Sequence, residues 1–454
     1  MLLGRTSELK HLNTYYDQEG SQIMVVYGAR NVGKTQLLNQ FAQDKPSYYY
    51  RARSASCREQ RYQWGAELGR EDIKLLKYPS YSDIFKSLIQ NEKGKKVIII
   101  DEFQYIVKSS EDFMKELISF VHSYWQQQNV MIILSSSSIG WVENSMINKI
   151  GDAAYELSSF LKVKELSFEH MMEFFPGYSM EQCIEAYAVL GGVPGLWEHF
   201  SDKVSIKENI CRYILEPHSL LRMEGQRIVE EELRETGVYN TILAAIAAGN
   251  HKLNDLYLQT EFSRAKISVY LKNLMELELV EKVFSYDTDG KENTQKGIYR
   301  ISNHFVDFYF TYIYPNMTDL ENLMPAEFYK KNIAPTFRTY VAEYFKTVCK
   351  QHIEKWNKWK ELPIEIDRIG EWVGKLGNID VIAQNDAGAT IVSICNWDKP
   401  LMRYDDYEWL LFCCKEAKIH VDYVYLFSVR RFDEKLNLEA KVKTNLKLIS
   451  LEDM

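Results

Sequence analysis

The sequence lacks the patterns by which cysteine marks a zinc site or a disulfide framework. Its seven cysteines are scattered, without a C-x-x-C pair or histidines at matching spacing, so we expect reduced and mostly buried thiols. Runs of 18 uncharged apolar residues are also absent, which argues against a membrane span. The start, Met1 to Arg5, lacks the basic and long apolar segments of a secretory signal, so we expect a cytoplasmic protein with no membrane partner.

An excess of positive charge is missing as well. The formal net charge is −8, so the molecule as a whole offers no general attraction to nucleic acid, although this value is compatible with a local basic face. What is present is 454 residues, 46% hydrophobic and 26% charged. This is the composition of an ordinary globular protein, and the length predicts two to four domains.

A glycine-rich loop follows the first buried strand. The apolar run 23–27 predicts a parallel strand, and residues 28–35 fit the pattern G-x-x-x-x-G-K-[ST], which leads into an amphipathic helix. Loop N–H groups and the helix N-terminus attract phosphate oxygens, Lys34 neutralises the β- and γ-phosphates, and the Thr35 hydroxyl suits magnesium. A glycine-rich turn without a ligand is the disfavoured alternative. The predicted cofactor-binding residues are Gly28, Ala29, Arg30, Asn31, Val32, Gly33, Lys34, Thr35 and Gln36.

Two further strands are predicted to end in polar residues at the same edge of the sheet. The run 97–100 ends in Asp101 and Glu102; we expect Asp101 to hold magnesium and Glu102 to polarise the attacking water. The alternative is an acidic turn after a core strand. The run 130–134 ends in four serines, of which Ser137 is the candidate sensor of the γ-phosphate. Serines are also ordinary turn formers, so both interpretations stay open.

These motifs together resemble the prokaryotic, archaeal-type ATPase family of AAA-like and signalling P-loop NTPases, whose members often carry a C-terminal restriction-endonuclease-like domain. The resemblance rests on the G-R-x-x-E-L-like start at 4–9, D-E-F-Q-Y at 101–105, the L-x-G-S-S-like stretch 134–138 and G-G-x-P at 191–194. It implies Mg-dependent ATP binding, with Arg5 beside the base and ribose and Pro194 near the base. Relatives commonly carry a Gly-Arg pair where this chain has Tyr155-Glu156-Leu157, so hydrolysis is expected to be slow or to need another arginine.

The resemblance and the helix and strand patterns predict an α/β protein of four parts. They are a P-loop core with a parallel sheet (1–165), a helical lid (166–230), a winged-helix domain (231–324) and a degenerate nuclease-like domain (325–454). The winged helix is predicted from a helix over 263–274 and a hairpin formed by 279–284 and 297–301, with 287–295 as its wing. Arg264, Lys266 and Lys272 are candidate phosphate contacts, but nearby glutamates favour a packing role over DNA binding.

The C-terminal part resembles a nuclease with a damaged site. Asp380, on a strand at 377–383, and Glu343, on a helix, match the metal-binding acids. Ile394 and Asn396 stand where the family's second carboxylate and lysine belong, and residues two apart on a strand share a face. Metal-assisted cleavage of a phosphodiester is therefore not expected.

The leading functional hypothesis is an ATP-driven conformational switch that binds ATP and ADP, hydrolyses ATP slowly and signals to a protein partner. A DNA-associated regulator with a structural nucleotide is the alternative, and an ATP-controlled nuclease is less favoured. ATP is preferred over GTP because no N-K-x-D element accompanies the loop. The partner and the oligomeric state are not encoded in any motif.

Overall fold

The computed structural model describes residues 3–70, 73, 75–89, 94–124, 129–286, 297–374 and 376–454. The chain forms two compact units. The first comprises Met1–Leu166 together with Val193–Leu196, and the second comprises Ser167–Gly192 and Trp197–Met454. The short segment Val193–Leu196 thus belongs to the first unit, although the residues on both sides of it belong to the second. The finer division into four domains stays a prediction.

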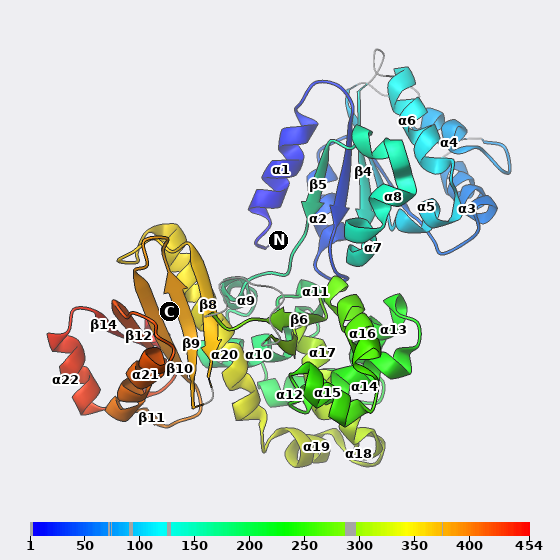
Figure 1. Ribbon diagram of the computed structural model, residues 1–454. Coiled ribbons are helices and arrows are strands. Elements are labelled where there is room, and N and C mark those ends of the chain that lie inside the picture. The colour runs from blue at the N-terminus through cyan, green and yellow to red at the C-terminus, as the bar shows by residue number, and fades with distance from the viewer. Residues whose placement is uncertain are drawn as a thin grey trace. The chain divides into compact units, whose positions relative to one another are not determined.

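A five-stranded parallel sheet lies at the centre of the first unit (Figure 1), with the strand order β2-β3-β4-β1-β5. Its strands are β1 (Gln22–Tyr27), β2 (Ser47–Arg51), β3 (Lys96–Asp101), β4 (Val130–Ser136) and β5 (Ser159–Lys162). The three predicted strands are confirmed, and β2 and β5 were not predicted. Because β4 lies between β1 and β3, the phosphate loop, the paired acids and the serines meet at one edge of the sheet.

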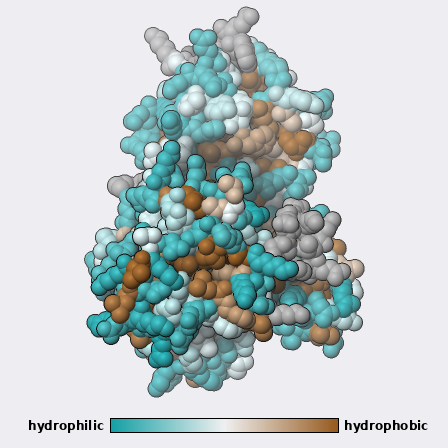
Figure 2. Space-filling view, turned by 60° about the vertical axis from the view of Figure 1, so that its left-hand side comes forward, coloured by the Kyte–Doolittle hydropathy of each residue, from teal (hydrophilic) through white to brown (hydrophobic). Residues whose placement is uncertain are grey.

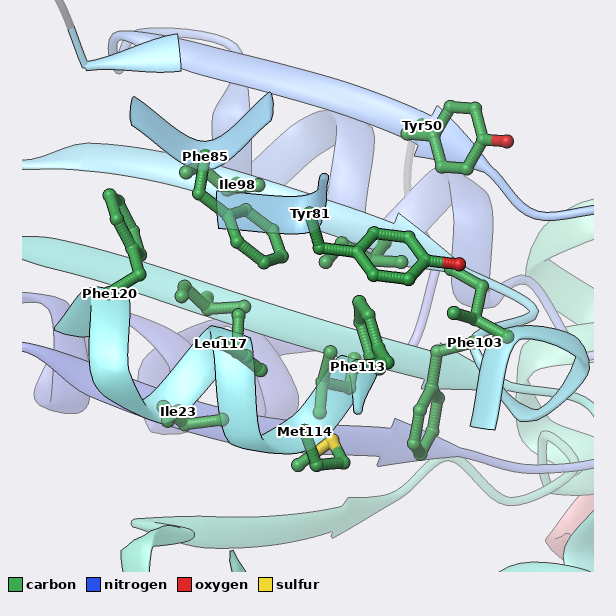
Figure 3. Close-up of a cluster of buried hydrophobic side chains, with 14 of the residues drawn as sticks. Ile23, Tyr50, Tyr81, Phe85, Ile98, Phe103, Phe113, Met114, Leu117 and Phe120 are labelled. Atoms are coloured by element: carbon green, nitrogen blue, oxygen red, sulfur yellow. The ribbon is translucent and has the colours of Figure 1, made fainter. Parts of the chain in front are cut away.

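Helices cover both faces of this sheet, because alternate side chains of its buried strands enter two separate cores. Ile23 and Val25 pack on one side, and Met24 and Val26 pack on the other with the first two helices. Figure 3 shows the aromatic rings of the larger core, among them Phe85 and Phe120, gathered against the sheet. The helices are α1 (Thr6–Tyr16), α2 (Lys34–Ala42), α3 (Cys57–Gly69), α4 (Tyr81–Leu88), α5 (Gln104–Ser109), α6 (Phe113–Tyr124), α7 (Ile139–Asn144), α8 (Met146–Ile150) and the 3-10 helix η1 (Gly151–Glu156).

The second unit begins with a helical region. Its α10 starts at a capping box formed by Ser179 and Gln182 and ends at Gly191, whose φ of 61° is favourable for glycine. The elements of this region are α9 (Phe168–Phe174), α10 (Met180–Leu190), α12 (Ile206–Ile210), the π-helical turn η2 (Cys211–Leu215), α13 (Glu224–Glu232), α14 (Thr236–Ala247), α15 (Leu253–Thr260) and α16 (Arg264–Glu276). The short helix α11 (Pro194–Trp197) begins in the segment Val193–Leu196 of the first unit.

An antiparallel hairpin follows α16 where the winged-helix interpretation predicts one. Strand β6 (Val280–Val283) pairs with β7 (Ile298–Ile301), so that Glu281 lies opposite Arg300. The predicted wing, 287–295, lies outside the described residues. Helix α16 buries Ile267, Leu271 and Leu274 along one face, as its periodicity predicts. The elements are therefore present, and their assignment to a winged helix stays a prediction.

A mixed five-stranded sheet of order β14-β12-β10-β9-β8 forms the C-terminal part of the second unit. Val424 and Leu426 of one strand pack with α21, whereas the rings of Tyr425 and Phe427 contact α20 on the opposite face. The strands are β8 (Arg368–Val373), β9 (Asn378–Gln384), β10 (Thr390–Asn396), β12 (Tyr423–Ser428) and β14 (Leu446–Ser450), with the small pair β11 (Leu401–Met402) and β13 (Arg431–Phe432).

Helices join the hairpin to this sheet and cover its two faces. The joining elements are α17 (His304–Phe308), η4 (Tyr309–Ile313), η5 (Tyr314–Asn316), α18 (Met317–Asn322), α19 (Pro325–Phe328), η6 (Tyr329–Ile333) and the long α20 (Phe337–Trp359). The last helices are α21 (Tyr404–Glu416), α22 (Glu434–Val442) and η7 (Leu451–Asp453).

The surface combines hydrophilic cover with hydrophobic patches. Hydrophilic residues cover most of the face drawn in Figure 2, with hydrophobic patches between them. Across the described part of the chain, no helix is long and apolar enough to cross a bilayer.

Candidate functional site

Backbone geometry shapes the loop between β1 and α2. A Cβ atom on Gly28 would lie 2.2 Å from the carbonyl oxygen of Val163, so only glycine fits there. Gly33 has a φ of 94° and Asn31 a φ of 61°, both in the left-handed region. Gly33 then leads into α2, whose first residues are Lys34, Thr35 and Gln36. The loop therefore has the close backbone curl that phosphate recognition requires.

The ammonium group of Lys34 is bound inside the loop. Its Nζ donates to the carbonyl oxygens of Gly28, at 2.8 Å, and Ala29, at 2.9 Å. Burial lowers the pKa of Lys34 to about 8, against the opposing attraction of Glu102 and Asp101. The three charged groups predicted to act together are thus within electrostatic reach of one another.

Asp101 and Thr35 share a partner that the motifs do not include. The Tyr49 hydroxyl donates to Asp101 Oδ2 at 2.6 Å, and the Thr35 side chain is hydrogen-bonded to the same tyrosine. Asp101 Oδ1 accepts from the backbone N–H of Glu102 at 3.1 Å. Both oxygens of the predicted metal ligand therefore have partners within the protein, and Tyr49 joins the two residues expected to bind magnesium.

The Glu102 carboxylate lies in a net of donors. Its Oε2 accepts from Gln104 Nε2 at 2.5 Å, from Ser137 Oγ at 2.7 Å and from the Ser137 backbone N–H at 3.3 Å. Burial alone would raise the pKa of Glu102, but these hydrogen bonds and the charge of Lys34 lower it below the ordinary value. Glu102 has a φ of 55°. The predicted base and the predicted sensor are therefore in direct contact.

Arg5 is buried beneath the loop. Its Nη2 donates to the carbonyl oxygens of Val32, at 2.7 Å, and Lys164, at 2.8 Å, while Nη1 pairs with Glu8 at 2.9 Å. This guanidinium therefore joins the start of the chain, the phosphate loop and the segment after β5. Contact with a base or ribose stays a prediction of the family resemblance.

Pro194 lies beside the phosphate loop in the segment Val193–Leu196. The backbone N–H of Gly195 donates to the Asn31 carbonyl at 3.0 Å, and a Cβ on Gly195 would lie 2.8 Å from Asn31 Cβ. A Cβ on Gly33 would meet Pro194 Cγ at 4.0 Å. The structure thus brings Val193–Leu196, which contains the proline of the G-G-x-P motif, to the loop; a role in covering the nucleotide stays a prediction.

The residues present suit a magnesium nucleotide. A hydroxyl, from Thr35, and a carboxylate, from Asp101, are the oxygen donors that Mg²⁺ prefers. Two buried atoms nearby, Ser135 Oγ and Gln104 Oε1, have no hydrogen-bond partner within the described ranges, so the site retains unused polar capacity. The donor set and the loop backbone therefore fit the predicted cofactor.

The C-terminal acids form an ion cluster. Lys346 of α20 pairs with Glu343 at 2.9 Å and with Asp380 at 3.5 Å, and Asp380 also accepts from the backbone N–H of Cys395 at 2.9 Å. Burial opposes a charged Lys346, yet the two carboxylates raise its pKa. Across the described residues no group of three or more His, Cys, Asp or Glu side chains could hold a metal ion. A lysine thus neutralises both predicted metal ligands.

Asn396, for which the family resemblance predicts a lysine position, takes part in structural hydrogen bonds. Its side chain donates to the Ser428 hydroxyl at 3.0 Å and accepts from the backbone N–H of Lys399 at 3.0 Å. Ile394 packs against the hydrophobic core of the sheet. Neither residue replaces the missing catalytic groups.

The three basic residues of α16 engage neighbouring side chains. Arg264 donates to Asn254 at 2.6 Å and stacks on Tyr257, Lys266 lies over the Phe262 ring, and Lys272 is 3.8 Å from Glu276. These contacts are those of an ordinary solvated helix face.

Tyr49, Gln104 and Gly195 were missed as functional residues. Tyr49 precedes Arg51, the register partner of Asp101, but sequence gives no sign that β2 lies beside β3. Gln104 lies inside the D-E-F-Q-Y motif, two residues after the predicted base, and Gly195 directly follows the proline of the G-G-x-P motif. These positions were the available signals.

Comparison with known families matches two parts of the chain. Residues 2–200 match the model of an ATPase domain predominantly from archaea, and residues 309–408 match a model of archaeal and bacterial proteins of unknown function. An uncharacterized protein of Methanocaldococcus jannaschii, MJECL04, is 29% identical over 394 residues, which cover 85% of each chain. Given this coverage, the similarity to this relative overlaps both matched regions.

Solved structures show more distant likenesses. The Walker-type ATPase PABY2304 of Pyrococcus abyssi is 19% identical, with a TM-score of 0.47, over 68% of this chain and 96% of its own. The ORC2 protein of Aeropyrum pernix, in ADPNP–ADP complexes, is 14% identical, with a TM-score of 0.46, over 72% of this chain and 95% of its own. TM-scores below 0.5 do not by themselves define a shared fold.

Proposed function

Because residues 2–200 match the model of an ATPase domain found predominantly in archaea, we propose that this nucleotide-binding chain is a slow, magnesium-dependent ATPase and an ATP-driven conformational switch. The observation that supports the proposal best is the electrostatic proximity of Lys34 to Glu102 and Asp101 at the edge of one parallel sheet. A triphosphate needs this combination of a cation, a curled backbone and hard oxygen ligands.

Binding begins with a change of partners for Lys34. In the protein alone its ammonium group bonds two loop carbonyls; the β- and γ-phosphates offer stronger, charge-assisted partners. Thr35 and Asp101 would hold magnesium once the Tyr49 hydroxyl releases them. When bound, the ion neutralises phosphate charge. ATP is therefore expected to reorganise three side chains that already lie together.

Hydrolysis depends on how Glu102 is held. Its carboxylate accepts three hydrogen bonds from Gln104 and Ser137, and these lower its basicity. A lowered pKa weakens a general base. Together with the missing arginine near Tyr155–Leu157, this supports slow turnover. If the Ser137 hydroxyl turned toward the γ-phosphate, the Glu102 carboxylate would be free to accept a hydrogen bond from the attacking water molecule.

The segment Val193–Leu196 supplies the route for the switch. It belongs to the first unit while the chain on both sides belongs to the second, and its Gly195 is hydrogen-bonded to Asn31 of the phosphate loop. A nucleotide that moves the loop would change this contact, and the chain on either side would transmit the change. A protein partner would then read the altered arrangement.

Calorimetric titration of the full chain with ATP, ADP and GTP in magnesium, followed by a phosphate-release assay, tests the proposal. Lys34→Ala should lower ATP affinity by about tenfold or more, and Glu102→Gln should keep binding while losing about 100-fold in turnover. Lys86→Ala, an exposed change on α4, is the matched control. The assignment would be refuted if Lys34→Ala bound ATP as tightly as the control and Glu102→Gln hydrolysed ATP as fast as the control.

A further inference from the structure

A cavity of about 800 Å³ lies within the second unit. It is bordered by the β6–β7 hairpin and by the helices α14, α17 and α20. The three helices can be followed in Figure 1. Its volume is within the range of small-molecule sites. Neither the nucleotide site nor the ion cluster at Asp380 accounts for this space.

One face of α20 lines the cavity almost entirely with polar side chains. Thr336, which precedes the helix, and Thr339, Tyr340, Glu343, Tyr344 and Thr347 recur at the three- and four-residue spacing of a helix face. A surface meant only to pack would carry aliphatic residues in these positions. Such a polar lining is suited to a ligand that forms hydrogen bonds.

The deep part of the cavity holds a fixed carboxylate. Asp307 accepts from the Tyr344 hydroxyl at 2.5 Å. Tyr344 in turn accepts from the Tyr340 hydroxyl at 3.3 Å, and Tyr340 also lies 3.3 Å from the backbone carbonyl of His304. Because burial raises the pKa of Asp307 to about 6, a positive partner there would be stabilised. The hydroxyl oxygens of Tyr340 and Tyr344 add polar atoms beside this carboxylate.

The basic groups of the wall do not offer an anion site. Arg300 is paired with Glu371 at 2.6 Å. His304 bonds the Tyr187 carbonyl through Nδ1 at 2.7 Å, and burial lowers its pKa to about 4, so it is neutral near pH 7. Glu281, opposite Arg300 on the hairpin, adds a third acid to the lining, besides Asp307 and Glu343. The electrostatic balance of the cavity is therefore negative.

We propose that this cavity binds a small organic cation, a protonated or quaternary amine, whose charged nitrogen lies against the Asp307 carboxylate, beside the hydroxyls of Tyr340 and Tyr344. The threonine hydroxyls of α20 would bond polar groups elsewhere on the ligand. The site is independent of ATP binding at the first unit, so its test does not depend on that function.

Titration calorimetry of the full chain with choline, and with its neutral isostere 3,3-dimethylbutan-1-ol, tests the charge requirement directly. Choline should bind, and the neutral alcohol should bind about tenfold more weakly or not at all. Spermidine serves as a second cation and citrate as an anion. Failure of both cations to bind, equal binding of the alcohol, or preferential binding of citrate would overturn the proposal.

Two variants locate the site. Asp307→Asn keeps an acceptor for Tyr344 while removing the charge, and it should weaken choline binding about tenfold. Thr339→Phe fills the cavity from an accessible position and should abolish binding, which keeps the test decisive if Asp307→Asn fails to fold. Glu408→Gln, an exposed change on α21, should bind as the parent does. Unchanged binding in Thr339→Phe would also overturn the proposal.

Discussion

Replacing Arg5 with alanine separates a structural role of this side chain from the base-binding role implied by the family resemblance. The guanidinium is buried and donates to the carbonyls of Val32 and Lys164 while pairing with Glu8. A hydrogen bond from a charged donor contributes about 1.5–3 kcal/mol to the free energy of unfolding. A carbonyl oxygen that loses its donor destabilises the fold more when it is buried than when it is exposed to water. Since one of the two carbonyl contacts is only partly buried, we expect a loss of about 3 kcal/mol.

Urea unfolding of the full chain measures this loss. With slopes of about 2–3 kcal/mol per molar urea, the midpoint should fall by about 1 M. Arg5→Lys should recover only part of it, because an ammonium group lacks the planar fork that reaches two carbonyls at once. Lys10→Ala, an exposed change on α1, the helix that begins directly after Arg5, is the control. If Arg5→Ala has the same unfolding midpoint as the control variant but a lower affinity for ATP, the structural role of Arg5 is wrong and direct contact with the nucleotide is correct.

Two further changes probe the nucleotide site. Tyr49→Phe removes the hydroxyl that is hydrogen-bonded to Asp101 and Thr35. The magnesium-dependent affinity for ATP should therefore rise about fivefold, the equivalent of about 1 kcal/mol. If calorimetry shows weaker binding instead, Tyr49 positions the ligand. Gly195→Ala places a Cβ 2.8 Å from Asn31 Cβ, so hydrogen exchange at residue 195 should become faster and ATP affinity should fall. The control is Gly69→Ala, where a Cβ meets nothing within 4 Å, and it should change neither quantity.

The phosphate loop and the paired acids could be predicted because their signals are local. A buried strand, a glycine loop and a helix follow one another between residues 22 and 42, and the acids end the next long apolar run. The structural reason for glycine at position 28 is different: the carbonyl of Val163, a residue far away in the sequence, leaves no room for a Cβ. The motif shows that glycine is present, but only the structure shows this contact.

Strands β2 and β5 were missed because neither is a continuous apolar run. Strand β2 alternates buried and exposed residues through Ser47–Arg51, and β5 buries none of its four residues fully. The partner of Asp101, Tyr49, was missed with β2. A hydrogen bond such as Tyr49 to Asp101 joins positions 52 residues apart, and its existence depends on strand order, which no local pattern specifies.

Helix α20 shows why the C-terminal site could be predicted only in part. Sequence identified Glu343 and Asp380 as acids and Asn396 as the lost lysine, but not the ammonium group of Lys346 that pairs with both acids. Glu343 also lines the neighbouring cavity, so one turn of this helix serves both features. An acid fixed by lysine cannot readily collect a hydrated divalent cation, because the ammonium group already supplies the compensating charge. The same helix therefore closes a metal site on one side and presents a polar wall to an open cavity on the other.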